Sequence, residues 1–426
     1  MTWYVFPGAE HAQAFVRHRV MRACPVVDDP ETVTDIADNA DCAEAEVEAI
    51  WLRAVSLYRS GVHPAVQLCI RHRGEIVLDR AVGHARGALP GRTIDERAVP
   101  LTTTTPINLF SAGKAVAAMA MHLLHEQGKF NLDAPVARYL PHFARHGKAT
   151  ITTRQLLTHR AGIPELPPEA FDLDVLADPE QIERMLCDLR PVSAPGRVTA
   201  YHALSGGMVM DALARRISGR SLRDVVATEI KAPLGLRRFD LGVAPDEVAE
   251  VATNVVAGPP VLPPLAQHIA RLIGIGWDQA VLLSNDPRFL TAVVPSGNVV
   301  VTARDAAAFY QCLLDGGSWE GRKVFARETV REAVKADRAT TLDRRIGLPL
   351  QYGSGFMLGT RTISLYGWNH PRAFGHVGLA NTFTWADPDR ELVVALVTTG
   401  KAVLGPHIPA LYNLVREIHR TFPATR

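Results

Sequence analysis

The sequence predicts a mixed α/β fold of the α+β type, built on one antiparallel sheet with strands from both ends of the chain. Two observations predict this fold. Candidate hairpins lie near the two ends, at residues 65–82 and 382–398, whereas helical patterns broken by proline and glycine fill roughly residues 130–295. We therefore expect the hairpins to join in one sheet flanked by the terminal helices, with a mostly helical subdomain alongside and a cleft between them.

The first predicted helix precedes the N-terminal hairpin. Apolar residues recur at helical spacing from Val47 to Tyr58, and Gly61 ends the element. Residues 65–71 and 75–82 have the pattern of two strands joined at His72-Arg73-Gly74. Residues 1–40 show weak periodicity and an acidic, turn-rich end, so we expect an N-terminal extension there and one globular domain over residues 41–426.

The C-terminal part repeats this combination of hairpin and helix. Residues 382–385 and 392–398 flank the turn sequence Ala386-Asp387-Pro388-Asp389-Arg390, and an amphipathic helix follows from Ile408 to Val415. Between the two ends, Gly258-Pro259-Pro260-Val261-Leu262-Pro263-Pro264 predicts a proline-rich loop within the helical subdomain. The extension and this loop are candidates for lid movement or for self-association into a homo-oligomer.

Composition excludes several classes of protein. The 426 residues carry a net charge of +2 with scattered basic residues, so we expect no nucleic-acid partner. The N-terminus lacks the pattern of a signal peptide and no apolar run is long enough for a membrane span, which predicts a cytoplasmic protein. The five cysteines include no Cys-x-x-Cys pair, so reduced, mostly buried thiols are expected.

Neither a metal nor an organic cofactor is expected. His122 and His125 lie three residues apart, but the sequence lacks the second histidine of a His-Glu-x-x-His zinc motif. His142 and His146 have no obvious carboxylate partner, so we interpret both pairs as structural. Gly274-Ile275-Gly276 does not continue into the glycine pattern of a dinucleotide site.

The most informative segment is Ser111-Ala112-Gly113-Lys114. It follows a predicted extended stretch, residues 106–110, and begins an apolar helical run over residues 115–124 that indicates a buried helix. A serine and a lysine one helical turn apart lie on the same face, which makes Ser111 a candidate nucleophile beside its activator. The alternative is a core helix in which Ser111 serves only as the N-cap.

A serine hydroxyl needs a neighbour that removes its proton. Burial would lower the pKa of Lys114 and make its amine such a base, and a phenol held near the ammonium is the alternative acceptor. Tyr201 offers this phenol on a predicted loop between the turn at Pro195-Gly196 and a small-residue helix. The strand-like Phe374-Gly375-His376-Val377-Gly378-Leu379 is a candidate source of an N–H for an oxyanion, and the alternative for His376 is a hydrogen-bonded strand histidine.

These motifs resemble the serine hydrolases related to β-lactamases and penicillin-binding proteins, especially class C β-lactamases and family VIII carboxylesterases. Ser111-Ala112-Gly113-Lys114 is similar to Ser-x-x-Lys, Tyr201-His202-Ala203 to Tyr-x-Asn, and His376-Val377-Gly378 to Lys-Thr-Gly or its His-x-Gly variant. The three occur in the family's order, and the resemblance covers roughly residues 60–420. It implies a β-lactamase-like fold.

The resemblance also implies roles. Ser111 would be the acylated nucleophile, Lys114 and Tyr201 would share the general-base and general-acid work, and the N–H groups of Ser111 and Leu379 would hold the oxyanion. His376 and Gly378 would lie on the substrate side of the site. The chain departs from the family pattern at Ala203, which replaces asparagine, and at His376, which replaces the lysine that favours the β-lactam carboxylate.

Both departures favour ester hydrolysis, so we expect a serine carboxylesterase that hydrolyses small to medium acyl esters through a Ser111 acyl-enzyme. The alternatives are a D-amino-acid peptidase, an acyltransferase or a weak β-lactamase on the same site, or a catalytically silent protein that binds an acyl ligand. No serine lies in a Gly-x-Ser-x-Gly pattern, which argues against an α/β-hydrolase. Acyl-chain length stays open, because the pocket walls come from the helical subdomain.

Overall fold

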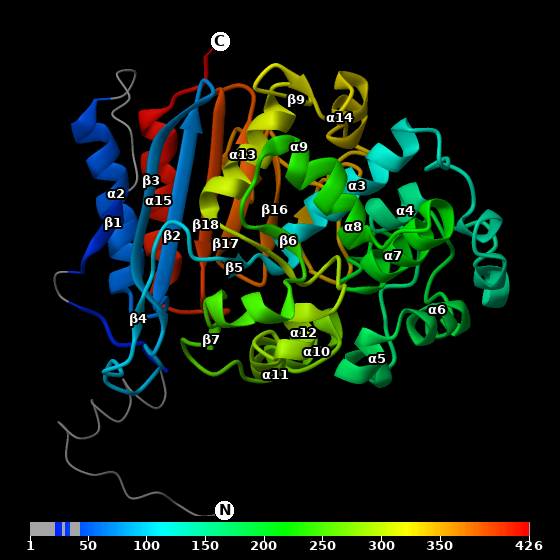
Figure 1. Ribbon diagram of the computed structural model, residues 1–426, viewed down its shortest axis with the longest axis horizontal. Helices are drawn as coiled ribbons and strands as arrows, with labels where there is room; N and C mark the ends of the chain where they lie inside the picture. Colours follow the sequence, from blue (N-terminus) through cyan, green and yellow to red (C-terminus); the bar gives the residue numbers. More distant parts are fainter. Residues whose placement is uncertain (1–21, 28–29, 35–42, 426) are drawn as a thin grey trace, which may run out of the picture.

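Strands from both ends of the chain form one antiparallel sheet in the computed structural model, which describes residues 22–27, 30–34 and 43–425 (Figure 1). The strand order is β1-β3-β2-β18-β17-β16-β13, and β4 pairs with β3. The bounds are β1 Thr32–Thr34, β2 Ala65–His72, β3 Glu75–Arg86, β4 Val99–Pro100, β13 Met357–Leu358, β16 Phe374–Gly378, β17 Thr382–Asp387 and β18 Leu392–Thr398. Since β18 pairs with β2 along the whole length of β18, the predicted union of the two hairpins is confirmed.

The N-terminal hairpin turns at Arg73 and Gly74, which both have positive φ values, of 53° and 90°. This is the backbone that matches the right-handed twist of a two-residue hairpin. Part of the predicted extension, β1, pairs with β3, and Cys24 is buried against the body of the protein. Most other residues of the predicted extension lie outside the described residues, so its boundary at residue 40 stays a prediction.

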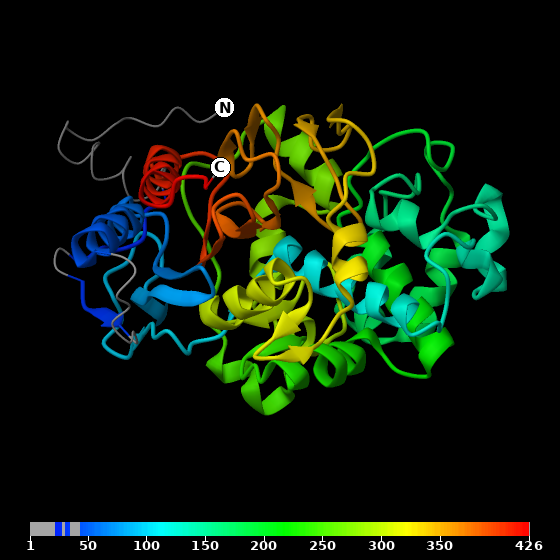
Figure 2. The ribbon, with the colours of Figure 1, turned by 90° about the horizontal axis from the view of Figure 1, so that it is seen from above.

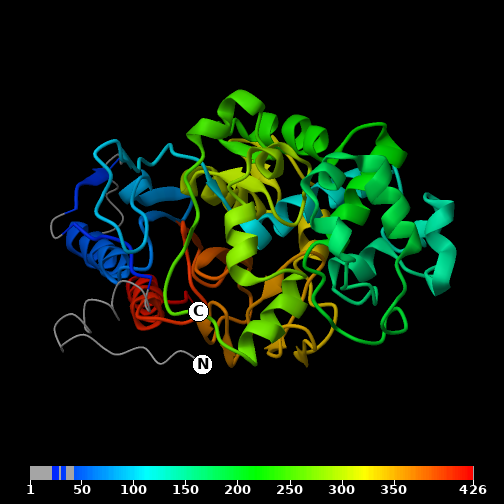
Figure 3. The ribbon, with the colours of Figure 1, turned by 90° about the horizontal axis from the view of Figure 1, so that it is seen from below.

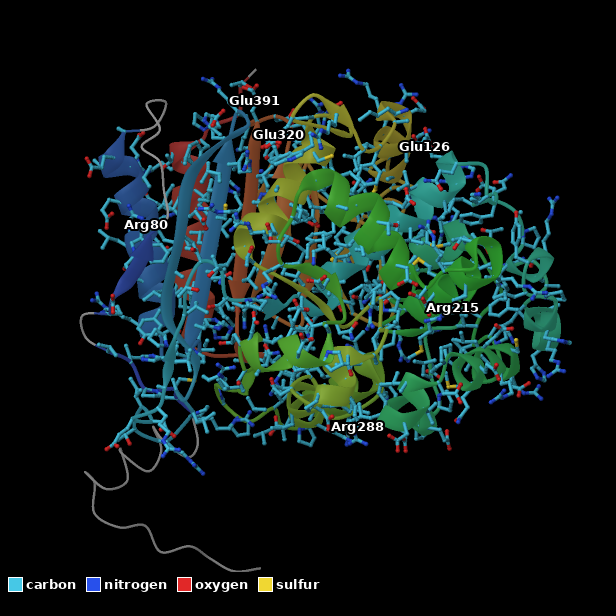
Figure 4. All side chains as sticks on the ribbon, in the orientation of Figure 1. Arg80, Glu126, Arg215, Arg288, Glu320 and Glu391 are labelled. Carbon is cyan, nitrogen blue, oxygen red and sulfur yellow. The ribbon has the colours of Figure 1, made fainter. Side chains whose placement is uncertain are left out.

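The two terminal helices cover one face of the sheet. Helices α2 (Glu44–Arg59) and α15 (His407–Thr421) lie side by side, as the blue and red ribbons of Figures 1 and 2 show. Trp51 and Tyr58 of α2 belong to one apolar cluster with the strand residues of that face. Arg80 on β3, which is labelled in Figure 4, binds Glu48 on α2 at 2.6 Å, and α13 (Ala303–Leu314) covers the opposite face. Both faces of β2 and β18 are therefore covered, which explains their almost uninterrupted apolar sequences.

A mostly helical region lies beside the sheet, as predicted. A small second sheet, β5-β8-β6, and a parallel pair, β7 with β19, connect the two parts. The remaining elements are β5 Ile107–Asn108, α4 Thr153–Leu157, α5 Leu173–Ala177, α6 Pro179–Asp188, α7 Ser205–Ser218, α8 Leu222–Val226, α9 Ala232–Leu234, β6 Phe239–Leu241, β7 Val255–Val256, α10 Leu265–Ile273, α11 Trp277–Leu283, α12 Pro287–Thr291, β8 Val299–Val301, α14 Arg327–Ala333 and β19 Gly400–Lys401, with three small hairpins β9 Ser318–Trp319 and β10 Arg322–Lys323, β11 Thr341–Leu342 and β12 Pro349–Leu350, and β14 Ile363–Ser364 and β15 Gly367–Trp368.

Helix α3 (Lys114–Glu126) runs through the centre of the molecule and contacts α7, α8 and β16. Its residues from Lys114 to Leu124 are all buried, which confirms the helix that the apolar run predicts. At its C-terminal end the carboxylate of Glu126 accepts the N–H of Ala326 at 2.9 Å and the hydroxyl of Thr329 at 2.7 Å (Figure 4). The C-terminal end of α3 is thus fixed to the first turn of α14.

Two further findings concern the part of the chain that the structure describes. No helix there is long and apolar enough to cross a membrane. The four cysteines within it, Cys24, Cys69, Cys187 and Cys312, are buried free thiols, as predicted for reduced cysteines.

Candidate active site

The backbone before Ser111 makes a sharp turn instead of continuing as a strand. Strand β5 ends at Asn108, whose side-chain oxygen accepts the N–H of Phe110 at 2.8 Å. Phe110 has a φ of 50°, and residues Phe110–Gly113 form a 3₁₀ turn that leads directly into α3. The prediction of extended backbone up to Phe110 is therefore wrong for its last two residues. A positive φ is costly for a bulky residue and is typical of functional sites, where the surrounding structure imposes it.

Ser111 does not cap α3. The helix begins at Lys114, its N-cap position is Gly113, and no side chain caps it. The alternative in which Ser111 is merely an N-cap is thereby wrong. The Ser111 hydroxyl instead interacts with Lys114, whose Nζ lies 3.0 Å from Ser111 Oγ and 3.3 Å from the carbonyl oxygen of Ser296.

Lys114 is buried, with 5% of its surface exposed. Burial lowers the pKa of Lys114 well below its ordinary value, because the buried site disfavours the charged form. Within the described residues, the amine contacts the oxygen atoms of Ser111 and Ser296, and no carboxylate forms an ion pair with it. The lowered pKa makes the neutral amine more accessible than in a solvated lysine, and the neutral amine is the form that accepts a proton from a hydroxyl.

Tyr201 lies on the loop before α7, as predicted, and faces the same pair. Lys114 Nζ lies 4.8 Å from the centre of the Tyr201 ring, and the phenol is hydrogen-bonded to Ser111. Burial raises the pKa of Tyr201 above its ordinary value, although the hydrogen bond from Ser111 acts in the opposite direction. The phenol is therefore protonated at neutral pH. The alternative in which a tyrosinate accepts the serine proton is not favoured by this environment.

Two residues that sequence reasoning missed hold Tyr201 in place. Asp343, which is fully buried, accepts the Tyr201 N–H with one carboxylate oxygen at 3.2 Å and the Tyr352 hydroxyl with the other at 2.9 Å. The His159 ring packs against the Tyr201 ring at 4.6 Å between centroids. Asp343 lies 142 residues beyond Tyr201 in a segment without a recognisable motif, so no sequence signal pointed to it.

His376 lies on β16 beside Tyr201, at 6.3 Å between ring centroids, and is 1% exposed. Its Nδ1 lies 2.9 Å from the Val377 carbonyl, so this nitrogen carries the proton and donates it. Burial, together with the nearby Lys114, lowers the pKa of His376 to about 3. The predicted site residue is thus close to the reacting groups and is also a hydrogen-bonded strand histidine, and it is neutral at physiological pH.

Gly378 allows β16 to approach the turn that carries Ser111. A Cβ atom at this position would lie 1.9 Å from the carbonyl oxygen of Leu109, which no neighbouring side chain could relieve by moving. The close approach that this glycine allows is therefore to the protein's own backbone. The next residue, Leu379, lines the same cavity as Ser111, whereas its role as an oxyanion donor stays a prediction.

A cavity of about 70 Å³, here called the acyl chamber, lies beside Ser111. Figure 3 shows the green-to-yellow helices α10–α12, which form part of its wall, on the lower side of the molecule. Of the described residues that line the chamber, none is charged. They are Phe110, Ser111, Phe171, Leu176, Ala203, Leu204, Ile273, Ile275, Ala280, Leu283, Phe289, Ser296, Gly297 and Leu379.

The other histidine positions singled out in the sequence do not form a metal site. No group of three or more His, Cys, Asp or Glu side chains within the described residues is arranged to hold a metal ion. His122 lies within α3 with its Nε2 3.1 Å from the Ser354 carbonyl. Burial lowers the pKa of His122 to about 4, so this histidine is a neutral core residue.

The chain is similar to known proteins over most of its length. A family model described as Beta-lactamase matches residues 44–415. The chain is 31% identical to "Esterase/beta-lactamase LipL" of Mycobacterium tuberculosis over 75% of this chain and 76% of that protein. It is 25% identical to a "Putative D-alanyl-D-alanine carboxypeptidase" of Escherichia coli over 82% of this chain and 80% of that protein. Among solved structures, "Crystal structure of a family VIII carboxylesterase" superposes with a TM-score of 0.76 at 25% identity, over 91% of this chain and 100% of that chain.

Proposed function

The chain belongs to the Beta-lactamase family of serine hydrolases, and from this premise we propose that it is a carboxylesterase that hydrolyses small to medium acyl esters through a Ser111 acyl-enzyme. One observation carries the proposal. The hydroxyl of Ser111, which lines an uncharged and mostly apolar chamber, lies beside the buried amine of Lys114 and the phenol of Tyr201. These groups supply a nucleophile, a base and a proton donor beside a space that suits an apolar acyl group.

Acylation begins when neutral Lys114 accepts the hydroxyl proton of Ser111 while Ser111 Oγ attacks the ester carbonyl carbon. The carbonyl oxygen becomes an oxyanion, which the N–H groups of Ser111 and Leu379 would stabilise as donors. Collapse of this intermediate breaks the bond to the alcohol oxygen. Tyr201 donates its proton to that departing oxygen and recovers a proton from the ammonium of Lys114, whose Nζ lies 4.8 Å from the centre of the Tyr201 ring.

Deacylation repeats these steps with water in place of the serine hydroxyl. The Tyr201 and Lys114 pair accepts one proton from the water as its oxygen attacks the acyl carbon. The second intermediate then breaks the bond to Ser111 Oγ, which takes up that proton, and the carboxylic acid leaves. Since each proton is returned, the cycle needs only water as its second substrate.

The charge of the site favours esters over β-lactams and peptides. At the position where the related enzymes carry a lysine for the substrate carboxylate, His376 is buried and its pKa is lowered to about 3. Ala203 contributes only a methyl group to the chamber wall, where the family motif has an asparagine amide. A substrate with a carboxylate or an acylamide would thus lose partners that a simple ester does not need.

Purified protein tests the proposal with three substrates side by side: 4-nitrophenyl butyrate, a D-alanyl-D-alanine peptide and a chromogenic cephalosporin. We expect the ester to have the highest kcat/KM, and we expect Ser111→Ala to abolish its turnover and the labelling of the protein by a fluorophosphonate. Faster cleavage of the D-peptide or the cephalosporin would favour the alternatives. Wild type that is neither labelled nor able to turn over any substrate would indicate a catalytically silent acyl-binding protein.

A further inference from the structure

A second, larger cavity adjoins the acyl chamber. This outer chamber has a volume of about 410 Å³ and shares four lining residues with the acyl chamber: Phe171, Ala203, Leu204 and Ile273. Ligand pockets in proteins usually reach about 300–1,000 Å³, so the acyl chamber alone is small and the two chambers together lie within that range. The residues between the acyl chamber and the outer chamber therefore determine how long a substrate can be.

Phe171 is the largest of the four shared residues. It ends the 3₁₀ turn Pro168–Phe171, and its ring reaches the C-terminal end of α10. There Gly274 has a φ of 92°, and a Cβ atom added to it would lie 2.1 Å from Phe171 Cζ. The tip of the ring is thus seated directly on the backbone of the facing helix. It spans the gap between two segments that lie about a hundred residues apart in sequence.

The two chambers differ in chemistry. The acyl chamber has no charged residue among those described in its wall, whereas the outer chamber combines apolar side chains, including Leu166 and Leu272, with Arg271 and an ion pair. That pair is Arg345 and Glu165, whose Nη1 and Oε1 atoms lie 2.7 Å apart.

From this geometry we propose that Phe171 is a partition that sets the acyl-chain length: it confines wild-type substrates to short linear acyl groups, and its removal opens the outer chamber to longer ones. The inference rests on the proposed esterase function and specifies its substrate class. In the wild type, catalytic efficiency should rise with each added methylene until the chain reaches the ring and then fall. Without the ring, it should continue to rise by up to about fourfold for each methylene that is buried.

The experiment measures kcat/KM for 4-nitrophenyl esters from acetate to decanoate, with wild type, Phe171→Ala and Phe171→Leu. We expect the optimum to move to longer chains in the order wild type, Leu, Ala, with at least a tenfold rise in the octanoate-to-butyrate ratio for Phe171→Ala. Phe171 is only half-buried, and the Leu variant keeps much of its packing. Thermal unfolding and titration of Ser111 with a fluorophosphonate correct each rate for the fraction of folded, active enzyme.

Leu166 supplies a matched control, because it lines the outer chamber and not the acyl chamber. With the partition intact, Leu166→Ala should leave the chain-length profile as in the wild type. In the Phe171→Ala background, Leu166→Ala should reduce the increase in kcat/KM for octanoate and decanoate, because the acyl chain then loses a contact in the outer chamber. Non-additive effects of the two substitutions would show that the acyl chain enters the outer chamber. Additive effects would indicate that Phe171→Ala only makes the site less rigid.

The outcomes separate this inference from the proposed function. If Ser111 is labelled and esters are hydrolysed but Phe171→Ala keeps the wild-type profile, the partition is refuted and the esterase function stands. A second series varies the alcohol at a constant butyryl group. A change confined to that series would place the alcohol, and not the acyl chain, against Phe171 and would also overturn the inference. If the wild type hydrolyses no ester, both proposals fail together.

Discussion

Lys401 Nζ lies 5.0 Å from the centre of the ring of Phe110, the residue that directly precedes Ser111. The amine is fully buried and donates to the Thr398 carbonyl at 2.6 Å and to the Thr382 hydroxyl at 3.3 Å. Phe110 is also the residue with the unfavourable positive φ in the turn before Ser111. Lys401 thus supports the ring whose backbone sets the direction of the turn.

The burial of Lys401 has a predictable effect on stability. Burial lowers its pKa from 10.5 to about 7, so between about pH 7 and pH 10.5 the unfolded chain holds a proton that the folded chain has lost. Stability therefore rises with pH over this window through Lys401. In Lys401→Met this contribution is absent. The unfolding free energy of the wild type should therefore increase relative to that of the variant as the pH is raised from 7 to 10. Urea denaturation at several pH values measures it, and a constant difference would contradict the prediction.

Lys114 should control the acid side of the activity profile. Because burial lowers its pKa, the fraction of neutral amine grows as pH rises through that lowered value, and kcat/KM for acylation should rise with it to a plateau. In Lys114→Ala, kcat/KM should be about 10²–10⁴-fold lower, and it should no longer rise with pH over this range. Stopped-flow release of nitrophenolate at a series of pH values tests this. The control is Lys129→Ala, on the exposed turn after α3, which should keep the wild-type profile.

Tyr201→Phe should retain the fold and lose the proton donor. The ring keeps its contacts with Lys114 and His159, whereas the hydrogen bond to Ser111 is lost. We expect kcat/KM to fall by about 10²-fold or more, and to fall further for poor leaving groups than for nitrophenolate, which needs little protonation. Rates for alkyl and nitrophenyl esters of the same acid measure this. An equal loss for both ester classes would instead indicate a positioning role for the phenol.

Gly378→Ala should disturb the turn that carries Ser111. The added methyl group would lie 1.9 Å from the Leu109 carbonyl, so strand and turn must move apart. Overpacking of this kind costs about 1–3 kcal/mol, and we expect loss of esterase activity together with slower fluorophosphonate labelling of Ser111. Gly206→Ala on α7 is the matched control, because its nearest atom would lie 3.7 Å away. Normal labelling of Gly378→Ala would show that the site tolerates the separation.

The sequence by itself determined most of the helices and strands and the local pairing of Ser111 with Lys114. Binary patterning predicted both hairpins, the terminal helices and the buried helix after Ser111, because burial on one face or all round leaves a periodic signature in a single segment. The Ser-x-x-Lys spacing placed Lys114 beside Ser111, because one helical turn is a local distance. Each of these inferences needed only neighbouring residues.

Only the tertiary structure decided which distant groups meet and in which protonation state. The contacts of Tyr201 with Asp343, of Gly378 with Leu109 and of Phe171 with Gly274 join segments from about a hundred to several hundred residues apart, and none leaves a pattern in the sequence. The pKa shifts of Lys114, Tyr201 and His376 likewise come from burial, which depends on everything that packs around a group. Desolvation is a property of the assembled core, and a local motif cannot encode it.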